Sequence, residues 1–125
     1  MTWLAVLAGG ALGSLARHGV NVGLAAVLAR PVPYATGLVN IVGAAIIGIL
    51  AGAAAGGGLQ WSPTLRAFVF VGVLGGFTTF SSFMLDTLTL RYTGEPVMAF
   101  LNVAGQLVFG LAAVWAGYSL GLSIR

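Results

Sequence analysis

The chain contains no cysteine and no lysine, and its 125 residues carry only five arginines, two acidic side chains and one histidine. The absence of cysteine excludes disulfides and thiolate chemistry. The arginines are scattered along the sequence and form no basic stripe, so we predict no nucleic-acid partner. One histidine and two acids offer no nucleophile and base at a plausible spacing. An enzyme is therefore the function class that fits worst.

Apolar residues and glycine take the place of the missing charges. Hydrophobic residues make up 59% of the chain, charged residues make up 6%, and the mean hydropathy is +1.07. Charge-free runs meet or approach the ~20 apolar residues that a helical membrane span needs. We predict an all-α membrane protein with a single four-helix transmembrane domain over residues 1–125. The predicted spans run at about Trp3 to Leu28, Ala35 to Ala55, Pro63 to Leu90 and Pro96 to Leu122.

The third predicted span contains the most informative run of the sequence, GGFTTFSSF between Gly75 and Phe83. A double glycine and several hydroxyl side chains interrupt an otherwise apolar segment here. A membrane helix gives up backbone hydrogen bonds only where neighbouring protein or a polar cavity replaces them, so we predict a mid-membrane break at this point that lines a functional site. Carbonyls freed in the first half favour a cation, whereas amides and hydroxyls at the start of the second half favour an anion.

Aromatic and polar side chains follow adjacent strips of the helix after this break. Phe80 and Phe83 are three residues apart on one face, while Thr79, Ser82 and Asp86 follow a neighbouring strip. An aromatic ring has a partially positive edge, so two phenyl edges and nearby hydroxyl donors are able to solvate a small anion. Two phenylalanines in a membrane helix ordinarily serve packing, and that interpretation stays open.

The second predicted span carries one side-chain amide, Asn40, on the same helical face as Gly43, Ala44 and Ile47. Small neighbours indicate that this face packs against protein rather than lipid. Asn40 is therefore placed to donate a hydrogen bond to an ion. Taken alone, however, it is better explained as an interhelical hydrogen-bond partner, because buried asparagine commonly has that function in helix bundles.

The arginines do not favour one orientation in the membrane. Short loops rich in arginine and lysine normally stay cytoplasmic. Here Arg66 and Arg125 fall on one side, Arg30 and Arg91 fall on the other, and Arg17 lies inside or near the end of the first span. This balance predicts insertion in both orientations and an antiparallel dual-topology homodimer. The alternative is that uncounted charges or the insertion machinery set one orientation.

Three motifs together resemble those of the Fluc (CrcB-like) fluoride channel family, over nearly the whole chain. Gly9 to His18 is similar to the family's first-span motif GGxxGxxxR, and Thr36 to Gly43 is similar to its second-span motif ending in NxxG. Gly75 to Phe83 resembles its GGFTTFSxF signature, which is the most specific of the three. Their order and spacing across four predicted spans argue against coincidence.

The resemblance implies a passive, fluoride-selective channel with two pores in an antiparallel homodimer of the bacterial inner membrane, which reduces fluoride toxicity in the cytoplasm. The implied partners are fluoride, the lipid bilayer and a second copy of the chain. The residues that it assigns to the fluoride pore are Asn40, Thr79, Phe80, Ser82 and Phe83. It also implies that Arg17 supplies positive potential at a vestibule. A structural Na⁺ ion at the dimer interface would bind the main-chain carbonyls of Gly75 and Thr78.

Two positions depart from the family pattern. Gln106 stands where the resemblance leads us to expect a serine, which puts that part of the polar path in doubt. Asp86 follows the signature where the family has a carboxylate, more often glutamate, and we interpret it as structural or vestibular rather than as a pore ligand. Arg17 has alternatives as well, since it is able to pair with Asp86 or to extend toward the membrane interface.

A proton-coupled exporter of small ions or small molecules, also with dual topology, is the main alternative function. Such an exporter needs a carboxylate within a membrane span. The two acids of the chain, Asp86 and Glu95, both fall near predicted span ends. Their placement favours a passive channel.

Overall fold

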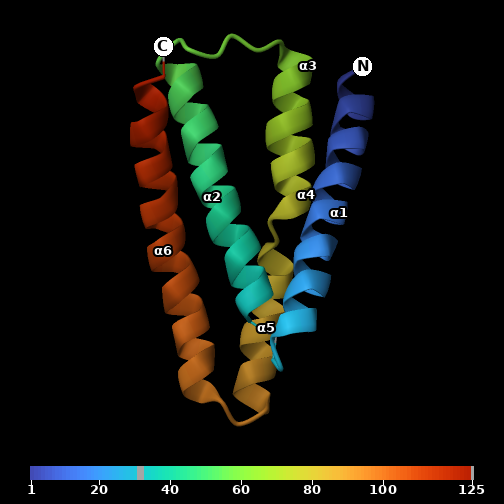
Figure 1. Cartoon of the computed structure of the whole chain (residues 1–125), viewed down its shortest axis with the longest axis vertical. Coiled ribbons are helices and arrows are strands. Elements are labelled where there is room, and N and C mark those ends of the chain that lie inside the picture. Colours follow the sequence, from blue (N-terminus) through green and yellow to red (C-terminus); the bar gives the residue numbers. More distant parts are fainter. Residues whose placement is uncertain (31–32, 125) are drawn as a thin grey trace.

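The computed structural model describes residues 1–30 and 33–124, and within these ranges the chain is helical, with no strand. Three long helices are continuous, whereas the helical segment before the last of them is divided (Figure 1). The elements are α1 (Thr2–Val27), α2 (Tyr34–Ala55), α3 (Pro63–Arg66), the π-helical η1 (Ala67–Leu74), α4 (Gly75–Phe77), α5 (Phe80–Tyr92) and α6 (Pro96–Leu122). The predicted all-α fold with an interrupted third helix is confirmed.

Within the described residues, three helical segments are long and apolar enough to cross a membrane. They are Tyr34–Ala55, Pro63–Tyr92 and Pro96–Leu122, with mean hydropathies of 2.2, 1.8 and 2.0 in their most apolar stretches. α1 has 26 residues, which is long enough for a span, but Arg17, His18 and Asn21 make it more polar than the others. These segments are typical of a multi-pass membrane protein.

Glycines bring α1 close to η1 and α4. A Cβ atom on Gly13 would overlap the carbonyl oxygen of Val73, and a Cβ atom on Gly72 would lie 2.8 Å from the Cα atom of Gly9. A larger residue at either position would therefore displace a backbone. Small residues let helices approach closely in lipid, where association depends on van der Waals packing. This seam holds the first half of the interrupted segment against α1.

A second glycine seam joins α2 to α6. Cβ atoms on Gly48 and Gly117 would overlap the carbonyl oxygens of Val114 and Ala45, respectively. The same pattern recurs one turn further along both helices, at Gly52 and Gly121. The two seams therefore define two helix pairs: α1 with η1 and α4, and α2 with α6.

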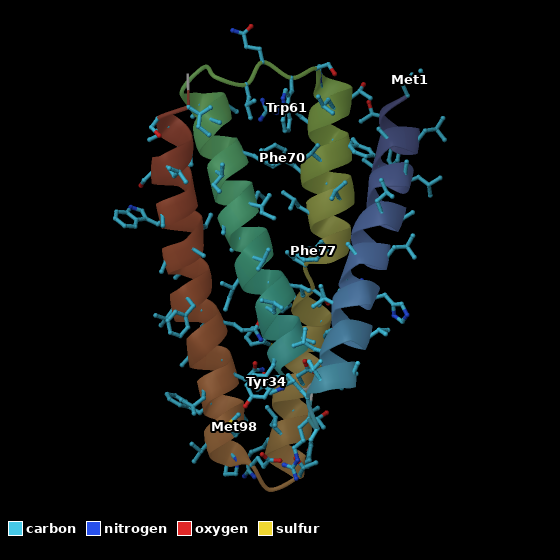
Figure 2. All side chains as sticks on the ribbon, in the orientation of Figure 1. Met1, Tyr34, Trp61, Phe70, Phe77 and Met98 are labelled. Carbon is cyan, nitrogen blue, oxygen red and sulfur yellow. The ribbon has the colours of Figure 1, made fainter. Side chains whose placement is uncertain are left out.

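The two helix pairs lie apart at the end that carries the N-terminus and approach each other toward α5 (Figure 1). Trp61 and Phe70 project between α2 and η1 at the wider end (Figure 2). Their rings meet edge to face, with centroids 6.3 Å apart. At the other end α5 packs beside α6 and links the pairs. The helix break thus lies where the two pairs converge.

Arginines lie at both ends of the bundle. Arg66 ends α3, beside the N-terminal end of the chain (Figure 1). Arg30 follows α1 and Arg91 lies in the last turn of α5, so both lie at the opposite end. Arg125, the fourth arginine of the predicted balance, lies outside the described residues. Insertion in both orientations stays a prediction.

Candidate functional site at the helix break

The interrupted helix breaks at Thr78 and Thr79. Both residues are extended, with φ and ψ of −82° and 159° at Thr78 and −152° and 116° at Thr79. The predicted interruption within Gly75 to Phe83 is confirmed, and it lies after the glycine pair, because Gly75–Phe77 is still helical. Gly76 instead allows close packing on α1, since a Cβ atom there would lie 2.6 Å from the Gly10 carbonyl oxygen. The β-branched threonines suit the extended backbone.

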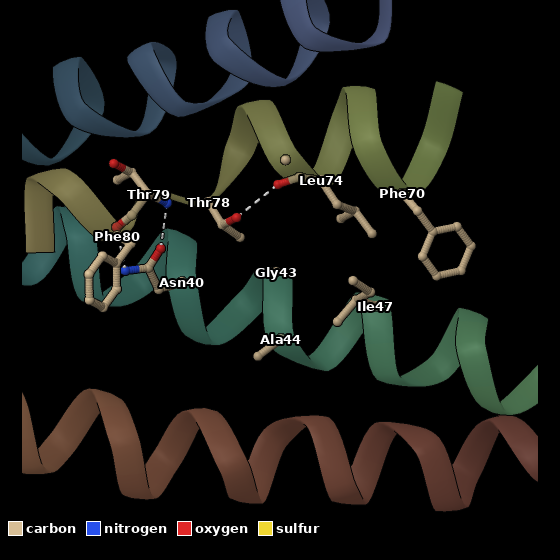
Figure 3. A pocket seen from close by; sticks show the side chains of 10 residues that line it. Asn40, Gly43, Ala44, Ile47, Phe70, Leu74, Thr78, Thr79 and Phe80 are labelled. Carbon is tan, nitrogen blue, oxygen red and sulfur yellow. Dashed lines mark hydrogen bonds between the residues drawn. The ribbon is translucent and has the colours of Figure 1, made fainter. Parts of the chain in front are cut away.

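Asn40 of α2 pairs with the backbone that the break frees. Its Oδ1 atom accepts a hydrogen bond from the Thr79 N–H at 2.8 Å, and its Nδ2 atom donates to the Thr79 carbonyl at 3.1 Å (Figure 3). The side-chain amide replaces the helical acceptor that the Thr79 N–H lacks, as a break inside a membrane requires. Asn40 therefore forms interhelical hydrogen bonds, and they join α2 to the backbone of Thr79 at the break.

The break frees the carbonyls of Gly75 and Thr78. In a continuous helix they would accept hydrogen bonds from the N–H groups of Thr79 and Ser82. Those N–H groups donate elsewhere: the first to Asn40 Oδ1 at 2.8 Å, and the second to the Thr79 hydroxyl at 3.2 Å. Carbonyl oxygens are the kind of ligand that hard cations prefer. The two residues predicted to bind sodium are therefore chemically suited to do so.

Arg17 reaches the break rather than Asp86. Its Nη1 atom donates a long hydrogen bond of 3.4 Å to the Thr78 carbonyl. Asp86 Oδ2 instead accepts a hydrogen bond of 2.6 Å from the Thr36 hydroxyl of α2. The alternative that pairs Arg17 with Asp86 is wrong, because Asp86 lies about two helical turns beyond Thr78. Arg17 thus brings positive charge to the broken segment.

Hydroxyl groups gather at the start of α5. Thr79 Oγ1 caps the helix by accepting a hydrogen bond from the Ser82 N–H at 3.2 Å, and it donates to Ser82 Oγ at 3.0 Å. Ser81 Oγ lies 3.3 Å from the same Oγ1 atom. The structure thus brings together the two predicted pore hydroxyls, Thr79 and Ser82. They lie at the helix end that carries a positive partial charge.

Phe80 and Phe83 contact each other edge to face. Their ring centroids are 5.9 Å apart, and the ring planes are inclined by 72°. The two rings differ in environment: Phe83 is 5% exposed, whereas Phe80 is 73% exposed. Phe83 therefore belongs to the core of the single chain, and Phe80 projects from it.

An open cavity of about 350 Å³ adjoins the break (Figure 3). Phe80 is among the residues that line it, whereas Ser82, Phe83 and Arg17 are not. The α2 face predicted from the sequence does line it. The lining residues are Asn40, Gly43, Ala44, Ile47, Phe70, Leu74, Gly75, Thr78, Thr79 and Phe80. One amide, the broken backbone and apolar side chains therefore surround a common space.

Sequence reasoning marked Gln106 of α6 as a departure from the family pattern but missed its hydrogen bonds with Asn40 and Asn102. Asn40 Nδ2 donates to Gln106 Oε1 at 2.7 Å, and Gln106 Nε2 donates to Asn102 Oδ1 at 2.8 Å. Asn102 is 7% exposed. The signal for this contact is the spacing of two amides four residues apart in an apolar helix, which places them on one face.

Known proteins are similar to this chain over nearly its whole length. A family model described as "CrcB-like protein, Camphor Resistance (CrcB)" matches residues 4–118. The chain belongs to this family. A CrcB-like relative from Paracoccus denitrificans, named fluoride-specific ion channel FluC, is 49% identical over 120 residues, which cover 96% of this chain and 94% of the relative. The family membership expected from the three motifs is confirmed.

Two further CrcB-like relatives carry the same name, fluoride-specific ion channel FluC. The one from Rhodospirillum centenum is 46% identical over 119 residues, covering 94% of this chain and 92% of the relative. The one from Parabacteroides distasonis is 42% identical over 119 residues, covering 95% of this chain and 91% of the relative. The similarity therefore includes every helix that surrounds the break.

Proposed function

We propose that this CrcB-like protein is a fluoride-selective ion channel that lets fluoride leave the cytoplasm down its electrochemical gradient, and so reduces fluoride toxicity. Relatives named fluoride-specific ion channels, similar over nearly the full chain, support this function and assign the protein to a family of channels rather than enzymes. The apolar helices support a location in the bacterial inner membrane. The structural observation that carries the proposal is the Asn40–Thr79 pairing at an interrupted helix.

The groups at the break match what fluoride requires. A small, strongly hydrated anion enters a dry path only where hydrogen-bond donors replace its water. Hydroxyls of Thr79 and Ser82 and the first amides of α5 are such donors, and Asn40 adds a side-chain amide beside them. The edges of Phe80 and Phe83 add partial positive charge without a fixed ion. Chloride is larger and forms weaker hydrogen bonds, so a narrow path of this kind excludes it.

Two antiparallel copies, each with four spans that include α1, would form the channel and enclose two pores. The surface of a single copy supports this arrangement. Phe80 is 73% exposed in the single chain, and the cavity of about 350 Å³ beside the break is open. A second copy that covers this side would enclose both features. The near balance of arginines at the two ends is compatible with insertion in either orientation.

A structural Na⁺ ion at the interface is part of the same proposal. The carbonyls of Gly75 and Thr78 would hold it, with each copy contributing the same pair. Support comes from the N–H groups of Thr79 and Ser82, which donate to side chains and so leave these oxygens free of their helical partners. When bound, the ion would supply a fixed positive charge that joins the copies. Arg17 would add positive potential on the same segment.

The acids support passive conduction over proton-coupled export. Asp86 accepts a short hydrogen bond from Thr36, and Glu95 Oε1 accepts one of 3.1 Å from Arg30 Nη1 outside the helices. Neither acid lines the cavity at the break. A carrier that couples fluoride to protons would need a titratable group on the path of the ion.

Reconstitution into liposomes with a fluoride electrode tests the function. We expect an imposed voltage to drive fluoride efflux, chloride to stay inside, and a pH gradient at zero voltage to have no effect. Efflux that follows the pH gradient would establish the proton-coupled alternative. Assembled protein that releases no fluoride would refute the fluoride function.

Reporter fusions at the C-terminus test the topology separately. Dual topology predicts that the reporter is labelled from both sides of the membrane in the same cells. Uniform labelling from one side would refute the antiparallel dimer without affecting the choice of ion.

A further inference from the structure

Side chains form a continuous hydrogen-bonded chain from the break through α6 and back to α5. Asn40 Nδ2 donates to Gln106 Oε1 at 2.7 Å, Gln106 Nε2 donates to Asn102 Oδ1 at 2.8 Å, and Asn102 Nδ2 donates to Thr87 Oγ1 at 2.9 Å. Thr87 in turn donates to the Phe83 carbonyl at 2.8 Å. We call the side chains of Asn40, Gln106, Asn102 and Thr87 the polar ladder.

The polar ladder has a single donor direction. The Phe83 carbonyl only accepts hydrogen bonds, so the Thr87 hydroxyl donates to it and accepts from Asn102. Asn102 then presents its oxygen to Gln106, which donates with Nε2 and presents Oε1 to Asn40. At the other end, the Thr79 N–H donates to Asn40 Oδ1. This bond fixes the orientation of the Asn40 amide, so that Nδ2 faces Gln106 of α6. Backbone groups at both ends thus set the orientation of all three amides.

Both N–H groups of the Asn40 amide are already used. One donates to the Thr79 carbonyl and the other to Gln106 Oε1. The Thr79 carbonyl is fixed by the main chain, whereas the Gln106 side chain has several rotatable bonds. Gln106 also borders a groove of about 580 Å³ beside α2 and α6, which gives its side chain room to move. An anion that binds Asn40 would therefore take the N–H that Gln106 holds.

We infer that Gln106 is the exchangeable partner of Asn40: its Oε1 atom accepts the Asn40 N–H while the pore is empty and gives up that N–H to fluoride. Asn102 and Thr87 act as positioning residues that keep this oxygen turned toward Asn40. The inference rests on the proposed function. An unpaired N–H in a dry path is costly, so the polar ladder stabilises the empty pore. The same competition weakens fluoride binding, and a channel conducts only if the ion also leaves.

The variant Gln106→Met tests the exchange, because methionine is similar in length and lacks the acceptor. The measurements are the fluoride Kd, by calorimetry at constant sodium concentration, and the maximal efflux rate from liposomes. We expect the Kd to fall about fivefold, which corresponds to about 1 kcal/mol, the net value of one hydrogen bond. The maximal efflux rate is expected to fall as well, because fluoride leaves more slowly. Leu107→Met, on the exposed side of the same helix, is the matched control and should change neither value.

Two variants of Thr87 test the positioning part. Thr87→Val keeps the shape and removes the hydroxyl, so Asn102 loses its acceptor and Gln106 is held less firmly. We expect the fluoride Kd to fall about twofold, a fraction of one hydrogen bond. Thr87→Ser keeps the hydroxyl and should bind fluoride as the unmodified chain does. Equal Kd values for the two variants would refute positioning through Asn102 and Thr87.

The direction of the change in Kd separates exchange from a structural defect. Damage to the site weakens fluoride binding, whereas removal of a competing acceptor strengthens it. An unchanged or higher Kd in assembled Gln106→Met protein would overturn the inference. If that variant does not assemble, the comparison of fluoride Kd values between Thr87→Val and Thr87→Ser tests the inference instead. Absence of fluoride efflux from the unmodified protein would refute the proposed function itself.

Discussion

The two halves of the interrupted helix are held in place by different interactions. Before the break, η1 and α4 contact α1 through glycines, so that backbone packs on backbone. After the break, α5 is joined to α2 by the Thr36–Asp86 hydrogen bond and to α6 by the Asn102–Thr87 hydrogen bond. Close backbone packing at glycines holds the first half in place, whereas side-chain hydrogen bonds hold the second. The donors that an anion requires are all on the second half or beside it.

The largest effect is expected at Gly13, in the seam between α1 and η1. Gly13→Ala places a Cβ atom on the Val73 carbonyl, and overpacking of this kind costs about 1 to 3 kcal/mol. We expect a lower melting temperature in detergent and less assembled protein. Gly10→Ala is the matched control, since an added Cβ atom there meets nothing within 4 Å. Equal losses in both variants would show that close approach does not hold this half.

Asn40→Leu should have the next largest effect, and its effect should be on conduction. The change leaves the Thr79 N–H without its side-chain acceptor, at about 1 to 3 kcal/mol for one unpaired group. We expect fluoride efflux about 10- to 100-fold lower, with the glycine seams keeping the protein assembled. Efflux at the unmodified rate from assembled protein would contradict the pore assignment of Asn40.

Thr36→Val tests whether polar pairing holds α5 against α2. It removes the donor that lies 2.6 Å from Asp86 and should lower stability by about 1.5 to 3 kcal/mol, the value of a hydrogen bond to a charged group. Thr36→Ser keeps the hydroxyl and is expected to melt close to the unmodified protein. If valine and serine at this position melt alike, the contact does not stabilise the helix.

Phe83→Leu should lower fluoride efflux about fivefold, because it removes one of two aromatic edges worth about 0.5 to 1.5 kcal/mol. Phe100→Leu is the control, since Phe100 is 69% exposed on α6 and does not line the cavity at the break. Efflux is measured in liposomes with equal amounts of assembled protein. A loss that is the same for both variants would indicate a general effect of aromatic residues rather than a pore site.

The smallest effect is expected at the ion pair between Arg30 and Glu95, outside the helices. Their atoms are 3.1 Å apart, but the Arg30 side chain is 80% exposed. Exposed pairs contribute about 0 to 1 kcal/mol, so Arg30→Ala should leave the melting temperature nearly unchanged at moderate salt. A large fall in the melting temperature of Arg30→Ala would mean that polar pairs stabilise the protein outside the second half of the helix as well.

Local patterns in the sequence predict much of this structure. Apolar runs predict the helices, the hydroxyl-rich run after Gly75 predicts an interruption, and helical spacing places Asn40 on the face that lines the cavity. These features depend on neighbouring residues alone. The exact position of the break does not, because Gly76 is used for packing against α1 and the extended residues are Thr78 and Thr79. Sequence periodicity alone does not distinguish a glycine that allows close helix packing from a glycine that breaks a helix.

Contacts between distant residues are the part that sequence reasoning missed. The sequence leaves three roles open for Arg17, at a vestibule, beside Asp86 or at the membrane interface, and only the packing of α1 brings it to the Thr78 carbonyl. The Asn40–Gln106 contact joins residues 66 positions apart. It forms because the glycine seam of α2 and α6 sets how closely their amides approach. The dimer, its sodium ion and its two pores stay predictions.

The position of Asn40 within α2 limits how the chain can change in length. The same helix must place Asn40 at the break and Gly48 against the Val114 carbonyl, about 12 Å further along the axis. One inserted residue between them would rotate one contact by about 100° relative to the other. Insertions and deletions should therefore be excluded from this stretch of α2, between the break and the seam with α6.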